Sequence, residues 1–156
     1  MTNDKIVERV VQDIAKALSK RDRGLKFKPA NPRPDGMNEN NDCVVRALSL
    51  AFNKPYTEVH KACADAGRRP RRGMFRHQTD RAIQTITGKP DASGSTYPYR
   101  HHRPTFAQFA AMNPEGNFIV IKRGHAVALI DGVYHDIGNS AGCGARCRVQ
   151  YYYRAA

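Results

Sequence analysis

Residues 117–137 read NFIVIKRGHAVALIDGVYHDI, and this stretch decides the fold. It is rich in β-branched residues, and Asp131-Gly132 separates two short apolar runs in its second half. An Asp-Gly pair between such runs is a strong local signal for a two-residue β-hairpin turn. The stretch therefore predicts antiparallel strands on either side of the turn. The later segment RVQYYYR, residues 148–154, predicts one more strand.

The turn also fixes a register for the predicted hairpin. With the turn at residues 131–132, Ile130 pairs with Val133 and the pairing continues outward along both strands. Side chains alternate between faces along a strand, so His125 and Asp136 share a face and lie diagonally within reach. The pattern therefore brings an imidazole and a carboxylate together. The residues predicted on this face are His125, Val127, Leu129, Tyr134, Asp136 and Gly138.

Helices are predicted in the part of the body that precedes these strands. One of them is mostly apolar, with Asn41 or Asp42 as its cap, and Thr105 can cap the short segment FAQFAAM. Helices come first and antiparallel strands second, which predicts an α+β fold. The predicted helical segments of the body are residues 42–52, 55–66, 78–87 and 106–112.

The first 36 residues have a different character. Residues 4–20 place apolar side chains along one side at helical spacing, which predicts an amphipathic helix. Residues 20–36, KRDRGLKFKPANPRPDG, are basic and proline-rich, which predicts an extended connector. We therefore divide the chain into residues 1–36 and a compact body, residues 37–156. The helix is predicted to pack on the body; the alternative is a helix that binds a partner or dimerises.

The charge balance is strongly basic. The 156 residues include 26 Lys and Arg against 14 Asp and Glu, a formal net charge of +12. Such an excess favours nucleic acid, acidic protein surfaces or anionic membranes as neighbours. No run approaches the roughly 18 apolar residues of a membrane span, and the N-terminus lacks the features of a signal peptide. Four cysteines without an export signal indicate reduced thiols, so we expect a cytoplasmic protein that does not enter a membrane.

Cys43 stands at the head of the apolar helix, within MNENNDCVVRALSLAF, residues 37–52. The first turn of a helix carries the positive end of the helix dipole, where a thiolate is favoured. A nucleophilic cysteine needs a base to take its proton and a third group to orient that base. His125 and Asp136 could supply both. The alternative is that these two only satisfy each other in a half-buried sheet, and that the thiol is inert.

Three segments carry a resemblance to a known family: NDCVVRALSLAF, PTFAQFAAMNPEGNFIVI and GHAVALIDGVYHDIGNS. Together they resemble short phage-encoded proteins of the papain-like cysteine peptidase type, over roughly residues 38–154. In papain-like enzymes a Cys begins a central helix, a His opens a strand of the form HAV, and an Asn or Asp follows on the next strand. The resemblance implies a papain-like fold, with N-terminal helices and the nucleophile helix packed on a C-terminal antiparallel sheet.

The resemblance also implies roles for single residues. Cys43 matches the family nucleophile and His125 the general base. For the third place, papain-like enzymes proper use the Asn of an NSWG segment, which corresponds to Asn139, whereas bacteriocin-processing relatives use an Asp, which fits Asp136. The hairpin register favours Asp136, and a bulge at Gly138 would favour Asn139 instead.

The chain departs from the family around the oxyanion site. Papain-like enzymes carry a Gln several residues before the nucleophile, and the equivalent segment GMNENN has none. Asn38, Asn40 or Asn41 could supply an amide donor, with the backbone N–H of Cys43 as the second donor. The Trp of NSWG is replaced by Ala141, and the chain has no Trp at all.

These features predict a cysteine-dependent hydrolase with a Cys-His-Asp triad. The resemblance implies a phage-encoded peptidase that acts on a protein or peptide in the host cytoplasm and needs no cofactor. The same residues would equally serve acyl transfer to an amine, and the bond attacked could be an amide or a thioester.

A second class of function comes from the basic segment RRPRRGMFR, residues 68–76, and from YRHHR, residues 99–103. These segments could contact phosphates without sequence preference, or dock an acidic protein. The alternative function is therefore a non-enzymatic basic protein on a papain-like scaffold that binds nucleic acid or an acidic host protein. The arginines predicted on this basic surface are Arg68, Arg69, Arg71, Arg72 and Arg76.

Zinc is a weaker hypothesis. Cys143 and Cys147, with His60 and Cys63, are ligand types that bind structural zinc. The C-x₃-C spacing is a loose match, however, and the two pairs lie far apart in the chain. We predict free thiols, with Cys63 packed in the core, and no metal.

Overall fold

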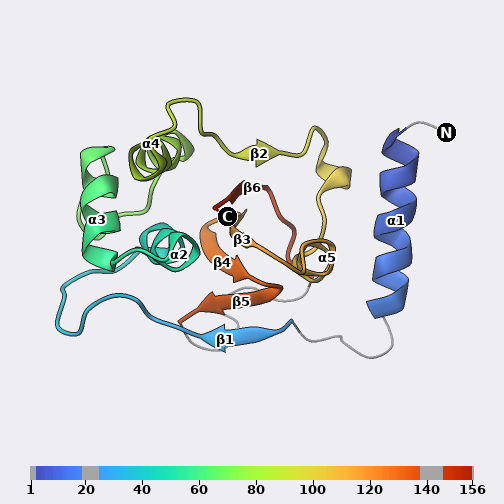
Figure 1. The fold of residues 1–156 in the computed structure, drawn as a ribbon, viewed down its shortest axis with the longest axis horizontal. Helices are drawn as coiled ribbons and strands as arrows, with labels where there is room; N and C mark the ends of the chain where they lie inside the picture. Colours follow the sequence, from blue (N-terminus) through green and yellow to red (C-terminus); the bar gives the residue numbers. More distant parts are fainter. Residues whose placement is uncertain (1–2, 19–24, 138–145, 156) are drawn as a thin grey trace.

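A sheet lies between two groups of helices in the computed structural model, which describes residues 3–18, 25–137 and 146–155 (Figure 1). This arrangement confirms the α+β class. The helices are α1 (Asn3–Leu18), α2 (Cys43–Phe52), α3 (Tyr56–Asp65), α4 (Arg76–Thr87), α5 (Phe106–Met112) and the 3₁₀ helix η1 (Arg100–His102). The strands are β1 (Phe27–Pro29), β2 (Ser95–Thr96), β3 (Asn117–Lys122), β4 (His125–Ile130), β5 (Val133–Asp136) and β6 (Tyr151–Arg154), in the sheet order β1-β5-β4-β3-β6-β2.

The β4–β5 hairpin has the predicted turn and the predicted register. Asp131 and Gly132 have φ values of 46° and 77°, which are the left-handed values that this two-residue turn requires. Glycine reaches them without steric cost, and aspartate is among the few other residues that tolerate them. The pairs along the hairpin are Ile130–Val133, Leu129–Tyr134 and Ala128–His135.

The sheet is mixed, which corrects the prediction of a wholly antiparallel one. β1 lies at the edge and runs parallel to β5. Its basic, proline-rich sequence gave no strand signal, but an edge position tolerates Pro29 because a missing N–H breaks no interior ladder there. Beyond β1, Arg33 donates from Nη1 to the carbonyl of Glu39 at 2.7 Å and pairs with Asp42. The connector thus adds a strand to the sheet and holds the segment that leads into α2.

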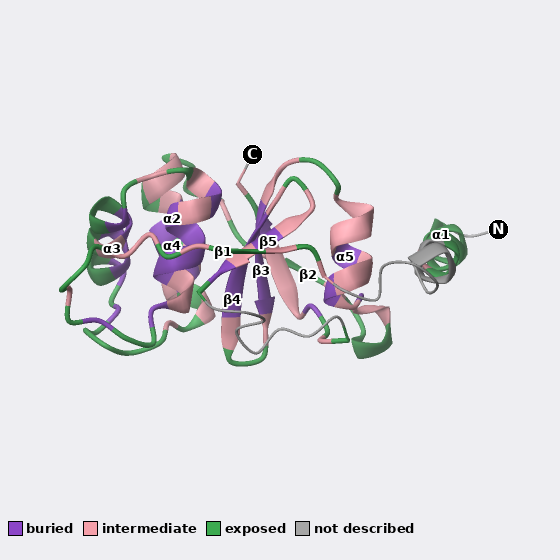
Figure 2. Cartoon of the chain, turned by 90° about the horizontal axis from the view of Figure 1, so that it is seen from below, coloured by how far each residue is buried: buried purple, intermediate pink, exposed green. Residues whose placement is uncertain are grey.

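Two apolar clusters occupy the two faces of the sheet. The helices α2, α3 and α4 lie on one side, and α5 lies on the other with α1 beyond it (Figure 2). The packing of α2 on β4, β3 and β5 agrees with the predicted packing of that helix on the strands. The first cluster includes Val45, Leu48, Ile119, Ala126 and Ala128, and the second includes Phe106, Phe109, Val127, Leu129 and Tyr134.

The predicted helices are confirmed to within about two residues. Thr105 caps α5 as expected, since its Oγ1 accepts a hydrogen bond from the N–H of Gln108 at 3.1 Å. The helix predicted from residue 78 begins earlier, at Arg76, where the Gln78 side chain accepts from the N–H of Phe75.

The N-terminal helix α1 contacts α5. Three of its apolar side chains, Ile6, Val7 and Val10, stay exposed.

None of the helices in the described residues is long and apolar enough to cross a membrane.

Candidate functional site

Cys43 is the first residue of α2, and its side chain is partly buried. Asp42 precedes it at the N-cap position but makes no side-chain capping bond. The imidazole of His125 and the backbone N–H of Ala126 are the neighbours that lower the pKa of the Cys43 thiol. The helix start therefore presents the thiol to the beginning of β4.

The imidazole of His125 lies between a thiol and a carboxylate. Its Nε2 is 2.5 Å from Oδ2 of Asp136, so Nδ1 is the ring nitrogen that remains for Cys43. His125 opens β4 and Asp136 ends β5, both at the end of the hairpin away from its turn. The structure thus brings together the three residues that the sequence selected.

The position of this site in the layers differs from what alternation alone suggests. Val127 and Leu129, two and four residues after His125, pack with α5, whereas Ala126 and Ala128 pack with α2. His125 nevertheless meets the thiol of α2. It can do so because it stands at the very start of its strand, so the site lies at the end of the sheet rather than over its face.

Asp136 is buried and fully occupied by hydrogen bonds. Its Oδ1 accepts from Nη1 of Arg46 at 2.6 Å and from the N–H of Ile137 at 2.8 Å. Arg46, also buried, donates from Nε to Asp42 Oδ1 at 3.1 Å. This arginine ties α2 to the carboxylate that contacts His125. Sequence reasoning missed it, although the i, i+4 spacing from Asp42 was a readable sign of an ion pair.

Asp42 ends this chain of buried contacts. Its Oδ2 accepts from the hydroxyl of Tyr56 at 2.7 Å and lies 3.3 Å from Nη1 of Arg33. Burial raises the pKa of Asp42, but these partners and Arg46 outweigh it and leave the pKa below its ordinary value. The carboxylate therefore stays charged and holds β1, α2 and α3 together near the thiol.

Two cysteines show opposite electrostatics. Burial raises the pKa of Cys63 to about 12. Burial also raises the pKa of Cys43, but the hydrogen bonds from His125 and Ala126 and the charges of His125 and Arg46 reverse the shift. The hydrogen bond to Asp136, followed by that to Cys43, raises the pKa of His125 to about 9. At neutral pH these shifts favour a thiolate beside an imidazolium.

The segment before Cys43 is held by a second buried carboxylate. Glu39 binds the guanidinium of Arg68 at 2.9 and 3.0 Å and Nε2 of His60 at 2.7 Å. It also accepts from the backbone N–H groups of Asn40 and Arg71. The hydrogen bond from Arg68 lowers the pKa of Glu39 to about 2. These contacts therefore anchor the loop before Cys43, which is the loop that would form an oxyanion site.

The two predicted oxyanion donors of this loop, Asn38 and Asn41, differ in their contacts. Asn41, with a left-handed φ of 48°, donates its amide to the carbonyl of Arg71 at 3.2 Å and to Asn40 Oδ1 at 3.4 Å. Its amide is thus engaged with the basic loop. Asn38 is exposed. The N–H of Cys43, at the first position of α2, has no acceptor within the helix.

Part of the prediction falls on residues that the structure does not describe. Gly138, Asn139, Ala141 and Cys143 lie outside the described residues. The choice between Asp136 and Asn139 therefore stays a prediction, with Asp136 in contact with His125.

The basic loop needs one correction. Arg68 was predicted on the surface, but it is only 5% exposed because its guanidinium is clamped by Glu39. Arg76 is partly buried; it donates to the carbonyl of Gly94 at 2.8 Å and lies over the ring of Tyr151. Arg69, Arg71 and Arg72 are exposed, as predicted.

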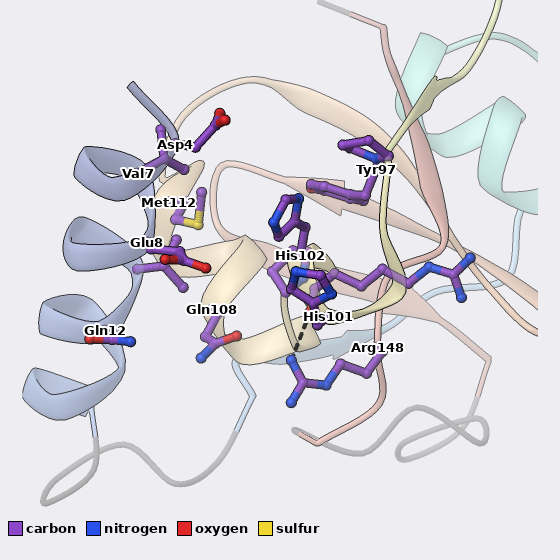
Figure 3. Close-up of a pocket in the computed structure, with 14 residues that line it drawn as sticks. Asp4, Val7, Glu8, Gln12, Tyr97, His101, His102, Gln108, Met112 and Arg148 are labelled. Carbon is purple, nitrogen blue, oxygen red and sulfur yellow. Dashed lines mark hydrogen bonds between the residues drawn. The ribbon is translucent and has the colours of Figure 1, made fainter. Parts of the chain in front are cut away.

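Neither a metal cluster within the described residues nor the cavity next to α1 adds to this site. Within the described ranges no group of three or more His, Cys, Asp and Glu could hold a metal. A cavity of about 480 Å³ lies between α1 and the body, with Glu8 and Gln12 on one side and His101 and Arg148 on the other (Figure 3). Its lining includes neither Cys43 nor His125.

Comparisons of the chain with protein families, with curated proteins and with solved structures found no match in any of the three. The candidate site therefore stands on its own geometry.

Proposed function

We propose that this chain is a papain-like cysteine hydrolase that cleaves peptide bonds in a protein or peptide substrate. The observation that carries the proposal is a single one. A thiol at a helix start lies beside an imidazole that lowers its pKa, and Nε2 of that imidazole is 2.5 Å from a buried carboxylate. The order of these groups along the chain, Cys43 on a helix, His125 opening a strand and Asp136 on the next strand, supports the papain-like assignment.

The first half of the reaction uses the thiolate and the imidazolium. Cys43 Sγ attacks the carbonyl carbon of the substrate, and the carbonyl oxygen becomes an oxyanion. The backbone N–H of Cys43 is one donor for it, and Asn38 is the candidate for the second because the amide of Asn41 is engaged elsewhere. His125 then gives its proton to the leaving amine as the carbon–nitrogen bond breaks.

The second half regenerates the thiolate. The now neutral His125 takes a proton from water, whose oxygen attacks the thioester carbon, and the carbon–sulfur bond breaks. Asp136 keeps the ring oriented and stabilises its protonated form through both halves. Arg46 acts on this carboxylate, so it is a positioning residue.

The test is selective alkylation. At pH 6, iodoacetamide should modify Cys43 at least about tenfold faster than Cys63 and Cys147, measured by peptide mass mapping, because the pKa of Cys43 is lowered beside an imidazolium whereas burial raises that of Cys63. Cys43→Ser removes the fast site and serves as the assignment control. Equal rates at all thiols would overturn the proposal.

A second candidate function rests on exposed charge. Arg69, Arg71 and Arg72 are exposed on a chain with a net charge of +12. As a non-enzymatic binder, the protein would bind nucleic acid or an acidic protein through this loop, and its retention on heparin would fall steeply with salt. Arg69→Gln with Arg72→Gln should then abolish most of the retention. Retention unchanged by that double substitution rejects this function.

A further inference from the structure

A strongly basic cavity lies beside the candidate catalytic centre. Its volume is about 730 Å³, and every formally charged side chain in its lining is a cation. These side chains come from η1, from the β3–β4 turn and from the segment that leads to β6. The lining is Arg100, His101, Arg103, Lys122, Arg123, Cys147, Arg148 and Gln150.

The arginines of this cavity have no acidic partner among the described residues. Over the described part of the chain, no ion pair joins Arg100, Arg103, Arg123 or Arg148 to a carboxylate. The Nε of Arg103 is buried and has no hydrogen-bond partner there. Arg148 instead donates from Nη1 to the carbonyl of Arg103 at 2.7 Å, the dashed contact in Figure 3. Like charges gathered in this way repel, and an entering anion would relieve the repulsion.

The cavity adjoins His125 through the sheet register. Lys122, which lines the cavity, is the direct cross-strand partner of His125, and Arg123-Gly124 forms the turn between them. Directly paired residues project to the same face with Cβ atoms about 5 Å apart. The cationic lining therefore begins next to the imidazole, at the end of the sheet where Cys43 also lies.

We propose that this cavity binds an acidic side chain of the substrate, so that the hydrolase acts on glutamate- or aspartate-containing segments of proteins. The inference rests on the proposed function, but its test measures peptide binding and does not require catalysis. Because the cavity begins at the cross-strand partner of His125, a side chain of a substrate held at Cys43 can enter it, and a carboxylate there accepts paired guanidinium hydrogen bonds. Proximity to the thiol favours a peptide over a nucleic acid as the occupant.

Binding can be measured without catalysis. The probe is a dye-labelled peptide of alternating glutamate and alanine, and its matched control carries glutamine in place of glutamate. Fluorescence anisotropy at about 0.15 M salt, where free charges are screened beyond about 8 Å, reports local contacts rather than net charge. Each peptide is titrated with the wild-type chain and with Cys43→Ala, which removes the reactive sulfur.

Two double variants carry the same loss of charge. Arg100→Gln with Arg123→Gln removes two exposed cations of the cavity, and Arg69→Gln with Arg72→Gln removes two exposed cations of the other basic loop. The glutamate peptide should bind at least about tenfold more tightly than the glutamine peptide. The first pair should weaken it at least about tenfold, or about 1.4 kcal/mol, and the second less than about twofold, since only the first removes charged hydrogen bonds to the bound carboxylates.

The outcomes separate the two proposals. Equal weakening by both pairs, or equal binding of both peptides, overturns the acidic-substrate proposal. So does a short oligothymidylate that binds more tightly than the peptide and is lost with the cavity pair, since the cavity would then be a nucleic-acid site. Selective glutamate binding without selective alkylation of Cys43 would support the cavity and reject hydrolysis, and the reverse result would do the opposite.

Discussion

Two buried carboxylates in this protein each bind one histidine and one arginine, but the two histidines have different neighbours. Asp136 binds His125 at 2.5 Å and Arg46 at 2.6 Å, and Glu39 binds His60 at 2.7 Å and Arg68 at 2.9 Å. We refer to them as the Asp136 centre and the Glu39 centre.

The two centres differ in the residue that each imidazole contacts on the side away from its carboxylate. His125 meets the sulfur of Cys43, whereas His60 stacks on the ring of Tyr56 at a centroid distance of 5.8 Å. A carboxylate, histidine and arginine are therefore no sign of catalysis by themselves. The Asp136 centre differs in having the Cys43 thiol beside its imidazole, and the Glu39 centre holds the loop that precedes Cys43.

The largest expected effect is on stability, and it should be larger at the Glu39 centre. Glu39→Ala leaves the buried guanidinium of Arg68 with only the carbonyl of Asn40, so the free energy of unfolding should fall by about 3–5 kcal/mol. Asp136→Ala should cost about half as much, because Arg46 keeps Asp42 as a partner. Urea denaturation of both variants measures the difference, and equal losses would contradict it.

The next effect is on thiol reactivity, and here the order reverses. His125→Ala should slow the alkylation of Cys43 at pH 6 at least about tenfold, because the hydrogen bond and the positive charge that favour the thiolate are lost. The matched variant His60→Ala should change the rate less than about twofold, with circular dichroism confirming that each variant is folded. Equal slowing in the two variants would remove the distinction between the centres.

The Asp136 centre was largely predictable from the sequence, and the Glu39 centre was not. Cys43 at a helix start and the register of His125 with Asp136 follow from local signals, namely an apolar helix and an Asp-Gly turn with strict alternation. The contact of Arg46 with Asp136 joins residues 90 positions apart, which no local pattern encodes.

Arg68 illustrates the same limit from the other side. Its neighbours in the chain are arginines and a proline, so composition predicted an exposed charge. Glu39, which pairs with it, lies in a polar stretch whose sequence gave no sign of burial. The ion pair with Glu39 buries Arg68, and the pairing with β5 makes β1 a parallel edge strand. Both depend on tertiary contacts that the local sequence does not encode.

A third comparison uses the histidine pKa. The Cε1 proton of His125 should titrate in NMR spectra with a midpoint near pH 9, so that the ring is charged below it. Asp136→Asn removes the largest cause of the raised pKa, and the midpoint should move toward 6.5. Glu39→Gln should leave it near 9, because that carboxylate does not contact the ring. A midpoint that is the same in wild type and Asp136→Asn would show that the hydrogen bond does not control this imidazole.

A fourth comparison is in acid, and it concerns the Glu39 centre. Glu39 has a pKa of about 2 when folded against 4.5 for a free carboxyl, so the unfolded chain takes up its proton first as the pH falls. Its stabilisation is complete above pH 4.5 and is lost as the pH falls through 2. Asp42 and Asp136 also have lowered pKa values, so Glu39→Gln should flatten the decline in unfolding free energy only in part. Glu58→Gln, at an exposed carboxylate, is the matched control for the loss of one negative charge. If Glu39→Gln keeps the wild-type slope in urea titrations between these two pH values, the ion pair with Arg68 does not stabilise the loop through charge, and the anchoring of the segment before Cys43 must come from its backbone hydrogen bonds.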